Sequence, residues 1–433
     1  MLKQLMSYLD AHENCYQKSF YLVPSENSLS PAARLPFLFD AYARYYLNDH
    51  RIFGHWVFFG GKDIADIQTS ILHPLLSDLC KAKFVDTRAL SGMNLMQLTL
   101  GAYCRPGDKV MVLPGEMGGH ACTQGVLETF ALKALFLPCL NANSIDEGKL
   151  AEVLYSEKPT LIYIDQANSL FPLRVDKLKT IVSSVSPTTR IHYDSSHING
   201  LILGNVIENP LIQGADSFGG STHKTFPGPH KGFFATNNES LFSRFQKTTD
   251  CLVSHQHMAD TIALAIALIE FSAKDGKEYA RCTVDNAKNF ARALSSYDVN
   301  VIGKESGFTE CHQVWISCDE DSAHLGNLLH EAGIQVNPFS SLPGCSTSGI
   351  RMGLNEPTRL GISSDDLIEL AKLVANCIQR KTPPARIAES VAEIRKKYTR
   401  IAYCYSSEEI RQLVEIFPSI NTSLNETLSC FGI

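Results

Sequence analysis

Short apolar runs alternate with helix-length segments through the middle of the chain. Five of these runs have the length and composition of strands: 109–114, 134–139, 160–165, 190–194 and 231–236. Strands separated by helix-length segments indicate crossover connections and a mostly parallel sheet. The pattern therefore predicts an α/β large domain over residues 51–275. The longest apolar run, TIALAIALI at 261–269, has about half the length of a membrane span and predicts a buried helix.

The pattern changes near Asp275. A helical segment is followed by NVIGKE, QVWIS and IQVNPF, which predict strands at 300–305, 313–317 and 334–339 with helices between them and up to the end. We expect a smaller C-terminal α+β domain over residues 276–433. Residues 1–50 form helical patches broken by YLVPSENSLSP, and they predict an N-terminal helical segment.

Composition excludes several classes of protein. Of 433 residues, 44% are hydrophobic and 19% charged, and the formal net charge is −6, so nothing predicts nucleic-acid binding. The start MLKQLMSYLD lacks the pattern of a signal peptide, and no membrane span is expected. Thirteen scattered cysteines without a CxxC motif favour reduced thiols and a cytoplasmic protein.

Five polar clusters lie at the ends of the predicted elements, the first before a helix and the next three directly after strands. They are LSGMN (90–94), GEMGGH (115–120), DQANS (165–169), DSSH (194–197) and the loop after GADSFGG (214–220). Ligands of parallel-sheet proteins bind beyond the carboxyl ends of the strands. We therefore expect these five clusters to meet in one site.

The stretch GADSFGGSTHKTFPGPHKG places Lys224 in a loop shaped by glycine and proline. Such a lysine, thirty residues after Asp194 at the end of a strand, can form a Schiff base with pyridoxal phosphate (PLP), whose ring nitrogen needs an acidic partner. On their own, Asp194 also fits a helix N-cap and Lys224 a surface lysine.

Two further features of a cofactor site are present. Backbone amides at a helix start can bind the phosphate, and Ser91-Gly92-Met93 are in place for this. His120 is a candidate for the ring that covers the cofactor face, although a loop histidine is the simpler interpretation. His255 and His257 lack a third ligand, so no metal site is expected.

An ordered set of motifs between residues 24 and 361 carries a family resemblance. They are PSEN, SGMN, RPGDKV, GGH, DSSHINGLILG, GADSFGGSTHKT, GPHKG and SGIRMGLNEPTRLG. Together they resemble serine hydroxymethyltransferase and its relatives. The resemblance implies a fold-type I PLP-dependent transferase, which usually works as a homodimer.

The resemblance also implies roles for individual residues. It assigns Lys224 to the Schiff base, Asp194 to the pyridine nitrogen and His120 to stacking on the cofactor. The other cofactor contacts that it implies are Ser91, Gly92, Met93, Ser169, His197 and Thr222. Arg351, whose planar fork suits a carboxylate, resembles the arginine that clamps the substrate, and Ser25 faces the same carboxylate.

The sequence departs from the family where folate-dependent members bind their second substrate. Their Y-A-E-G-Y and Y-Y-G-G motifs are replaced within 39–63, where Phe58-Phe59-Gly60-Gly61 stand, and no glutamate occurs between Asp40 and Glu116. This makes tetrahydrofolate doubtful as a cosubstrate. The pattern is closer to the L-threonine transaldolases, as THKTFPGPHKG, GFTECHQV (307–314), YDSSHINGLILG and IAYCYS (401–406) indicate.

The transaldolase branch cleaves L-threonine to acetaldehyde and adds the retained glycyl group to a second aldehyde. Without the glutamate, Tyr45 or Tyr46 is our candidate for proton handling, and packing at a dimer interface is an equal alternative. His223 either shuttles a proton or orients the substrate. The remaining alternatives are a folate-dependent hydroxymethyltransferase, a threonine aldolase and a non-catalytic binding protein.

Overall fold

The computed structural model describes residues 1–47, 49–345 and 347–430. Its centre is a seven-stranded sheet in the order β2-β10-β9-β8-β7-β3-β4. The strands are β2 (Phe84–Asp86), β3 (Lys109–Val112), β4 (Lys133–Phe136), β7 (Leu161–Ile164), β8 (Arg190–Asp194), β9 (Ser217–Ser221) and β10 (Gly232–Thr236). The sheet is parallel except for β10, which runs antiparallel to both neighbours.

Because β10 reverses direction between β9 and β2, the strand β2 again points the same way as β9. The carboxyl ends of β2, β3, β7, β8 and β9 therefore meet at one edge of the sheet. These are the strands that the five polar clusters follow, so the expected α/β architecture is confirmed.

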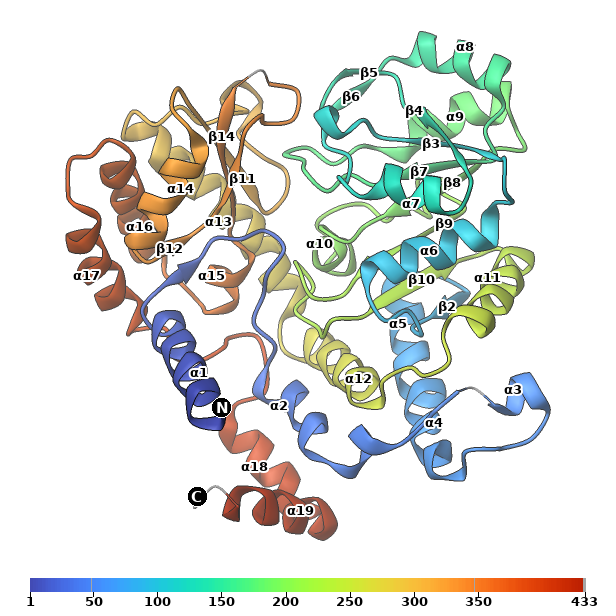
Figure 1. The fold of residues 1–433 in the computed structure, drawn as a ribbon, viewed down its shortest axis with the longest axis horizontal. Helices are drawn as coiled ribbons and strands as arrows, with labels where there is room; N and C mark the ends of the chain where they lie inside the picture. The colour runs from blue at the N-terminus through green and yellow to red at the C-terminus, as the bar shows by residue number, and fades with distance from the viewer. Residues whose placement is uncertain (48, 346, 431–433) are drawn as a thin grey trace.

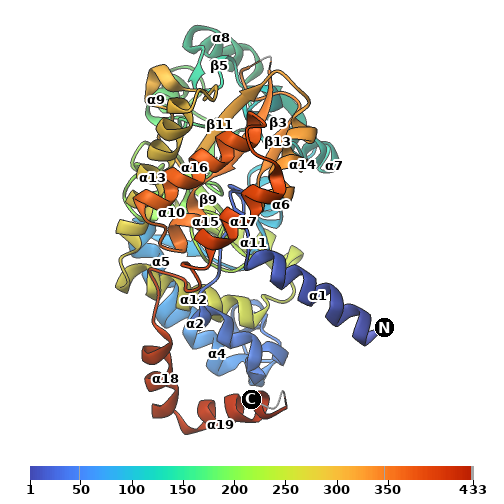
Figure 2. The same ribbon diagram turned by 90° about the vertical axis from the view of Figure 1, so that its left-hand side faces the viewer.

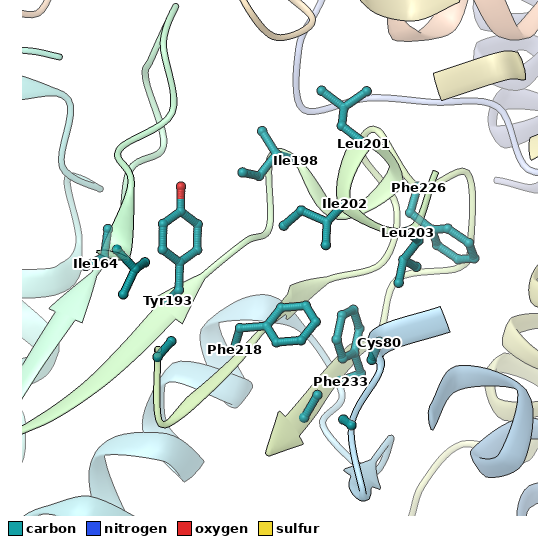
Figure 3. Packing of buried hydrophobic residues seen from close by; sticks show 14 of the residues in the cluster. Cys80, Ile164, Tyr193, Ile198, Leu201, Ile202, Leu203, Phe218, Phe226 and Phe233 are labelled. Carbon is teal, nitrogen blue, oxygen red and sulfur yellow. The ribbon is translucent and has the colours of Figure 1, made fainter. Parts of the chain in front are cut away.

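Helices cover both faces of this sheet. On one face α6 (Gly92–Tyr103), α7 (Thr123–Thr129) and α11 (Glu239–Leu252) share an apolar cluster with the sheet. On the other face α5 (His73–Cys80), α8 (Glu147–Glu157), α9 (Val175–Val185), α10 (Asn199–Leu203) and α12 (Met258–Ala273) pack in a second cluster. Figure 3 shows this second cluster, with Phe218 and Phe233 of the sheet facing Ile202 and Cys80.

The inner strands β3 and β7 are mostly apolar because both faces of the sheet are covered. The run at 261–269 is likewise part of a buried helix, α12, as its sequence predicts. Among the described residues no helix is long and apolar enough to cross a bilayer.

The C-terminal half holds a three-stranded antiparallel sheet, β11-β14-β13. Its strands are β11 (Gln313–Cys318), β13 (Asn337–Phe339) and β14 (Ser348–Gly353). The helices α13 (Gly276–Ser296), α14 (Ser322–Glu331), α16 (Ser364–Ile378) and α17 (Pro384–Arg395) pack with it around a separate apolar cluster (Figure 1). β1 (Phe20–Tyr21) pairs with β12 (Ile334–Gln335), which ties the N-terminal segment to this half.

Three predicted strands differ in the structure. The run at 334–339 is split into β12, which pairs with β1, and β13, which pairs with β14. The NVIGKE run makes only an isolated bridge from Val301 to Ile316 and then turns into a 3-10 helix, Lys304–Ser306. Gly303 has φ +83°, which ends the extended backbone there. The run at 134–139 is split into β4 and β5 (Cys139–Asn141), because Pro138 interrupts it; β5 pairs with β6 (Ser144–Ile145).

The chain ends lie outside the two sheets. α1 (Leu2–Tyr16) has no buried residue and projects from the body of the molecule (Figure 2). α18 (Ser407–Ile416) and α19 (Pro418–Ser429) lie at the lower end of Figure 1. The remaining short helices are α2 (Pro31–Arg34), α3 (Asp49–Phe53), α4 (Lys62–Ile67) and α15 (Asn355–Arg359).

Candidate active site

A cavity of about 180 Å³ opens at the carboxyl edge of the large sheet. It is lined by residues from all five polar clusters. Of the residues predicted from sequence, it brings together Ser91, Gly92, Met93, His120, Asp194, His197, His223 and Lys224. Sites at this edge are typical of open α/β sheets.

Lys224 reaches the cavity from a closed loop. Thr222 N donates to Lys231 O (3.0 Å), Gly228 N donates to Thr222 O (2.8 Å), and the Thr222 hydroxyl donates to Pro229 O (2.6 Å). Asn27 Nδ2 donates to Lys224 O (2.6 Å) from the N-terminal segment. Burial lowers the pKa of Lys224 from 10.5 to about 8, although Asp194 acts against this shift. The amine is thereby prepared for nucleophilic use at mildly basic pH.

Asp194 is held at the end of β8 by two donors. The Tyr163 hydroxyl donates to Oδ2 (2.8 Å), and Ser196 N donates to Oδ1 (3.0 Å). Both bonds fix the orientation of the carboxyl group at the cavity.

The start of α6 forms one end of the cavity. Ser91 is its N-cap and accepts from Asn94 N (3.1 Å), so the first amides of a twelve-residue helix face the lining. A Cβ on Gly92 would lie 3.0 Å from Ser221 Cβ, so glycine keeps this corner open. The Ser221 hydroxyl is buried and has no hydrogen-bond partner among residues 1–47, 49–345 and 347–430. Amides, a hydroxyl and a helix N-terminus together suit a phosphate.

His120 is held over the cavity by Asp165, a residue the sequence interpretation passed over. Asp165 Oδ2 accepts from His120 N (3.2 Å) and from the Thr123 hydroxyl (2.5 Å), and Oδ1 accepts from Leu113 N (3.3 Å). Burial, followed by repulsion from Asp194, raises the pKa of Asp165 to about 7. Burial lowers the pKa of His120, and Lys224 and Arg351 add to this effect. His120 is therefore a neutral ring.

Several buried polar atoms around the cavity have no partner among the described residues. They include Ser169 Oγ, His197 Nδ1, Ser221 Oγ, His223 Nδ1 and Arg351 Nε. Buried polar atoms are rarely left unpaired in proteins, so a polar ligand is expected here. A phosphate-bearing pyridine with a phenolic oxygen would meet these donors, Asp194 and Lys224, so the residues fit PLP.

Arg351 lies on β14, behind the cavity lining. Its guanidinium donates to Asn168 Oδ1 and to Asn337 Oδ1 (2.8 Å), and Phe339 lies 5.0 Å from its Cζ. Burial lowers the pKa of Arg351 to about 10, so it stays charged at neutral pH. Its recorded partners are neutral, which leaves its charge for an anionic ligand.

The other sequence candidates lie around this core. His197 is buried and stacks on His312 (5.8 Å between ring centres). His223 stacks on His230 (3.9 Å), and burial lowers its pKa to about 3, which disfavours a role as proton donor. Ser25 lies between Pro24, whose carbonyl contacts His312 Nε2 (3.2 Å), and the segment of Asn27.

Tyr45 and Tyr46 do not line the cavity within the described part of the chain. Tyr45 stacks on His255 (4.6 Å between ring centres), and Tyr46 is buried beside Ala65 and Met258. Their proposed proton-handling role stays a prediction.

Sequence interpretation missed Tyr163, Asp165 and Asn168. The signal for the last two was present in DQANS, from which only Ser169 was selected. Tyr163 stands inside an apolar strand, and nothing in its sequence context marks its bond to Asp194. Among the described residues no group of three or more His, Cys, Asp or Glu side chains is placed to hold a metal ion.

Fold and cavity together define the fold-type I class of PLP-dependent transferases. The chain belongs to the serine hydroxymethyltransferase family, whose model matches residues 2–374. It is 39% identical over 371 residues to an L-threonine:uridine-5'-aldehyde transaldolase of a Streptomyces species, covering 85% of this chain and 87% of the relative. It is 33% identical over 418 residues to the serine hydroxymethyltransferase of Korarchaeum cryptofilum, covering 91% and 94%.

A solved structure is also similar. It is the crystal structure of L-threonine transaldolase from Pseudomonas fluorescens in its internal aldimine state, with a TM-score of 0.86 and 27% sequence identity. The match covers 96% of this chain and 97% of the other. The fold expected from sequence is therefore confirmed along nearly the whole chain.

Proposed function

We propose that this protein is a PLP-dependent L-threonine transaldolase, which cleaves L-threonine to acetaldehyde and adds the glycyl group to an acceptor aldehyde. The observation that carries the proposal is its 39% and 36% identity to two L-threonine:uridine-5'-aldehyde transaldolases, over 85% and 87% of the chain. The cavity with Lys224, Asp194 and the start of α6 supports the cofactor.

Different residues would contact different parts of the cofactor. Lys224 would hold it covalently, Asp194 would keep a proton on its ring nitrogen, and His120 would cover its face. Ser91, Gly92, Met93 and Ser221 would bind the phosphate, while Ser169 and His197 would face the phenolic oxygen. When bound, PLP supplies an electron sink for cleavage between Cα and Cβ. Thr222 closes the loop of Lys224 and adds rigidity.

The substrate carboxylate would bind Arg351, with Ser25 beside it. His223, neutral at physiological pH, is suited to orient the β-hydroxyl rather than to donate a proton to the glycyl carbon. Slow protonation of the glycyl carbon would keep the glycyl group available for a second aldehyde. Tyr45 and Tyr46 remain candidates for proton handling if a partner copy brings them to the cavity.

A folate-dependent serine hydroxymethyltransferase is the second candidate. Relatives with that name cover similar shares of the chain, so the family alone does not separate the two activities. The missing glutamate between Asp40 and Glu116 favours the transaldolase. A threonine aldolase would differ by releasing glycine.

We also propose a cytoplasmic homodimer built from a large domain (51–275), a small domain (276–433) and an N-terminal segment (1–50). The separate apolar clusters around the two sheets support the division. The exposed apolar side chains of α1, among them Leu2, Leu5 and Leu9, support a partner surface.

The test compares two substrate pairs with the purified holoenzyme. We expect acetaldehyde release from L-threonine and formation of a β-hydroxy-α-amino acid from a panel of aldehydes that includes uridine-5'-aldehyde. L-Serine with tetrahydrofolate should give no glycine above the enzyme-free control. Glycine formation from serine and folate at a rate above that of threonine cleavage would instead establish the hydroxymethyltransferase.

A further inference from the structure

Asn168 connects the substrate arginine to the cofactor side of the protein. Arg351 and Asn337 are cross-strand neighbours in the small antiparallel sheet, so Asn337 holds Arg351 from within its own sheet. Asn168 follows β7 of the large sheet and holds the other arm of the guanidinium. It thus fixes where the guanidinium lies relative to the cavity.

The backbone of Asn168 is anchored on two sides. Ala167 N and Asn168 N both donate to Gly118 O (3.0 Å each), in the loop that carries His120. On the other side Gln313 Nε2 donates to Ala167 O (3.1 Å). Gly118 has φ +100°, and a Cβ there would lie 2.2 Å from Asn168 O. The backbone at Asn168 is therefore fixed, and its side-chain amide supports Arg351 from a fixed position.

The chemistry of this support matters as much as its position. An amide oxygen accepts the hydrogen bonds of a guanidinium but carries no charge to neutralise it. A carboxylate in the same place would form an ion pair with Arg351 and compete with an incoming carboxylate. Arg351 Nε is also buried and has no partner in the part of the chain that the structure describes, so the guanidinium keeps donor capacity for a ligand.

We propose that Asn168 is a positioning residue that presents Arg351, still fully charged, to the carboxylate of the amino-acid substrate. The inference rests on the proposed function, because it takes Arg351 as the carboxylate site. It goes beyond that function by naming the neutral side-chain amide that makes the site prefer amino acids to analogues that lack the carboxylate.

The test measures the dissociation constants of glycine and of glycinamide, which lacks the carboxylate, by spectral titration of the holoenzyme. In Asn168→Asp we expect the glycine constant to rise by about tenfold or more while the glycinamide constant does not rise, since the new carboxylate pairs with Arg351. Asn168→Ala should also reduce the ratio of the glycinamide constant to the glycine constant, by a smaller factor than Asn168→Asp does. Asn143→Asp, which adds the same charge on the exposed β5–β6 turn, should behave as the parent.

The possible results distinguish a failure of the Asn168 role from a general structural defect and from a failure of the proposed function. An unchanged preference for glycine in Asn168→Asp, or an equal loss of both ligands, overturns the role of Asn168. If Arg351→Ala in the parent leaves the preference intact, the carboxylate site is wrong and this proposal falls with it. Transaldolase activity is judged separately, by product formation from L-threonine and an aldehyde.

Discussion

At the residue scale, the stretch THKTFPGPHKG (222–232) holds two buried lysines, Lys224 and Lys231, seven positions apart, and their surroundings differ. Lys231 is buried and donates to Gln256 O (2.8 Å), whereas Lys224 lines the cavity. Burial lowers the pKa of both amines to about 8. The two lysines therefore differ in their access to the cofactor cavity rather than in their basicity.

We therefore predict that borohydride reduction of the holoprotein attaches PLP to Lys224 and leaves Lys231 unmodified. Peptide mapping by mass spectrometry reads the outcome. Lys224→Ala should abolish the attachment, and Lys231→Met is the matched control that should keep it. A label on Lys231 in the parent would contradict the site.

Asp165 is the second residue whose role depends on position. It accepts three hydrogen bonds from the segment that carries His120. In Asp165→Asn one oxygen becomes an NH2 donor, so the bond from Leu113 N to Oδ1 and the two bonds from His120 N and the Thr123 hydroxyl to Oδ2 cannot all survive. We predict that PLP binds about tenfold more weakly, on the basis of about 1–3 kcal/mol for an unsatisfied buried donor.

Fluorescence titration of the apoprotein with PLP measures this loss, and circular dichroism in the cofactor band reports the environment of His120. Thr123→Val removes only one of the three bonds and should have a smaller effect. Equal affinity of Asp165→Asn and the parent would show that the carboxylate does not position His120.

At the element scale, the segment between β1 and α2 is tied to α15. The Ser28 hydroxyl donates to Glu356 Oε1 (3.0 Å), and the same segment carries Ser25 and Asn27. Burial raises the pKa of Glu356 from 4.5 to about 7. The folded protein thus holds this proton over a range in which the unfolded chain releases it.

This gives a pH dependence of known sign. Below pH 4.5 Glu356 is protonated in both states, and its ionisation costs no stability. Between pH 4.5 and about pH 7 the loss of unfolding free energy grows with pH, and above about pH 7 the loss is constant. Glu356→Gln cannot ionise, so its unfolding free energy should exceed that of the parent by up to roughly 3 kcal/mol above pH 7 and by little at pH 4.5. Urea denaturation at pH 5 and pH 8 measures the difference. A difference that is equal at both pH values would refute the assignment.

The sequence predicted the elements whose pattern is local. The strands at 109–112 and 161–164 are mostly apolar because both faces of the sheet are covered, whereas the strand at 190–194 alternates polar residues with Ile191 and Tyr193. The polar clusters after these strands follow from crossover topology. The prediction of a strand at NVIGKE was wrong because Gly303 turns the chain, and the apolar residues of this run do not indicate the turn. Asp165, Asn168 and Tyr163 were missed because their partners lie 31 to 183 positions away in sequence.

At the scale of the whole molecule, α1 is a fifteen-residue helix without a buried side chain. Isolated helices of this length are marginal in water, so α1 needs a partner surface to be stable. Leu5 and Leu9 are exposed on it, one turn apart. A second copy of the chain is the partner that the proposed homodimer supplies.

We predict that the parent sediments as a dimer at micromolar concentration and that the double variant Leu5→Glu, Leu9→Glu dissociates at least about tenfold more readily, since each apolar side chain contributes about 1 kcal/mol or more. Analytical ultracentrifugation measures both. Tyr155→Glu, on the exposed face of α8, is the control for added charge. A parent that sediments as a monomer at these concentrations would contradict the dimer.

The central claim is that the glycyl carbons of L-threonine pass directly to a second aldehyde. The most direct measurement uses L-threonine labelled with ¹³C at both glycyl carbons, an unlabelled aldehyde and an excess of unlabelled glycine, with mass analysis of the β-hydroxy-α-amino acid formed. The account predicts a product that carries both labelled carbons, together with unlabelled acetaldehyde. A product that carries the unlabelled glycine from solution, or labelled glycine as the only amino-acid product, would contradict it.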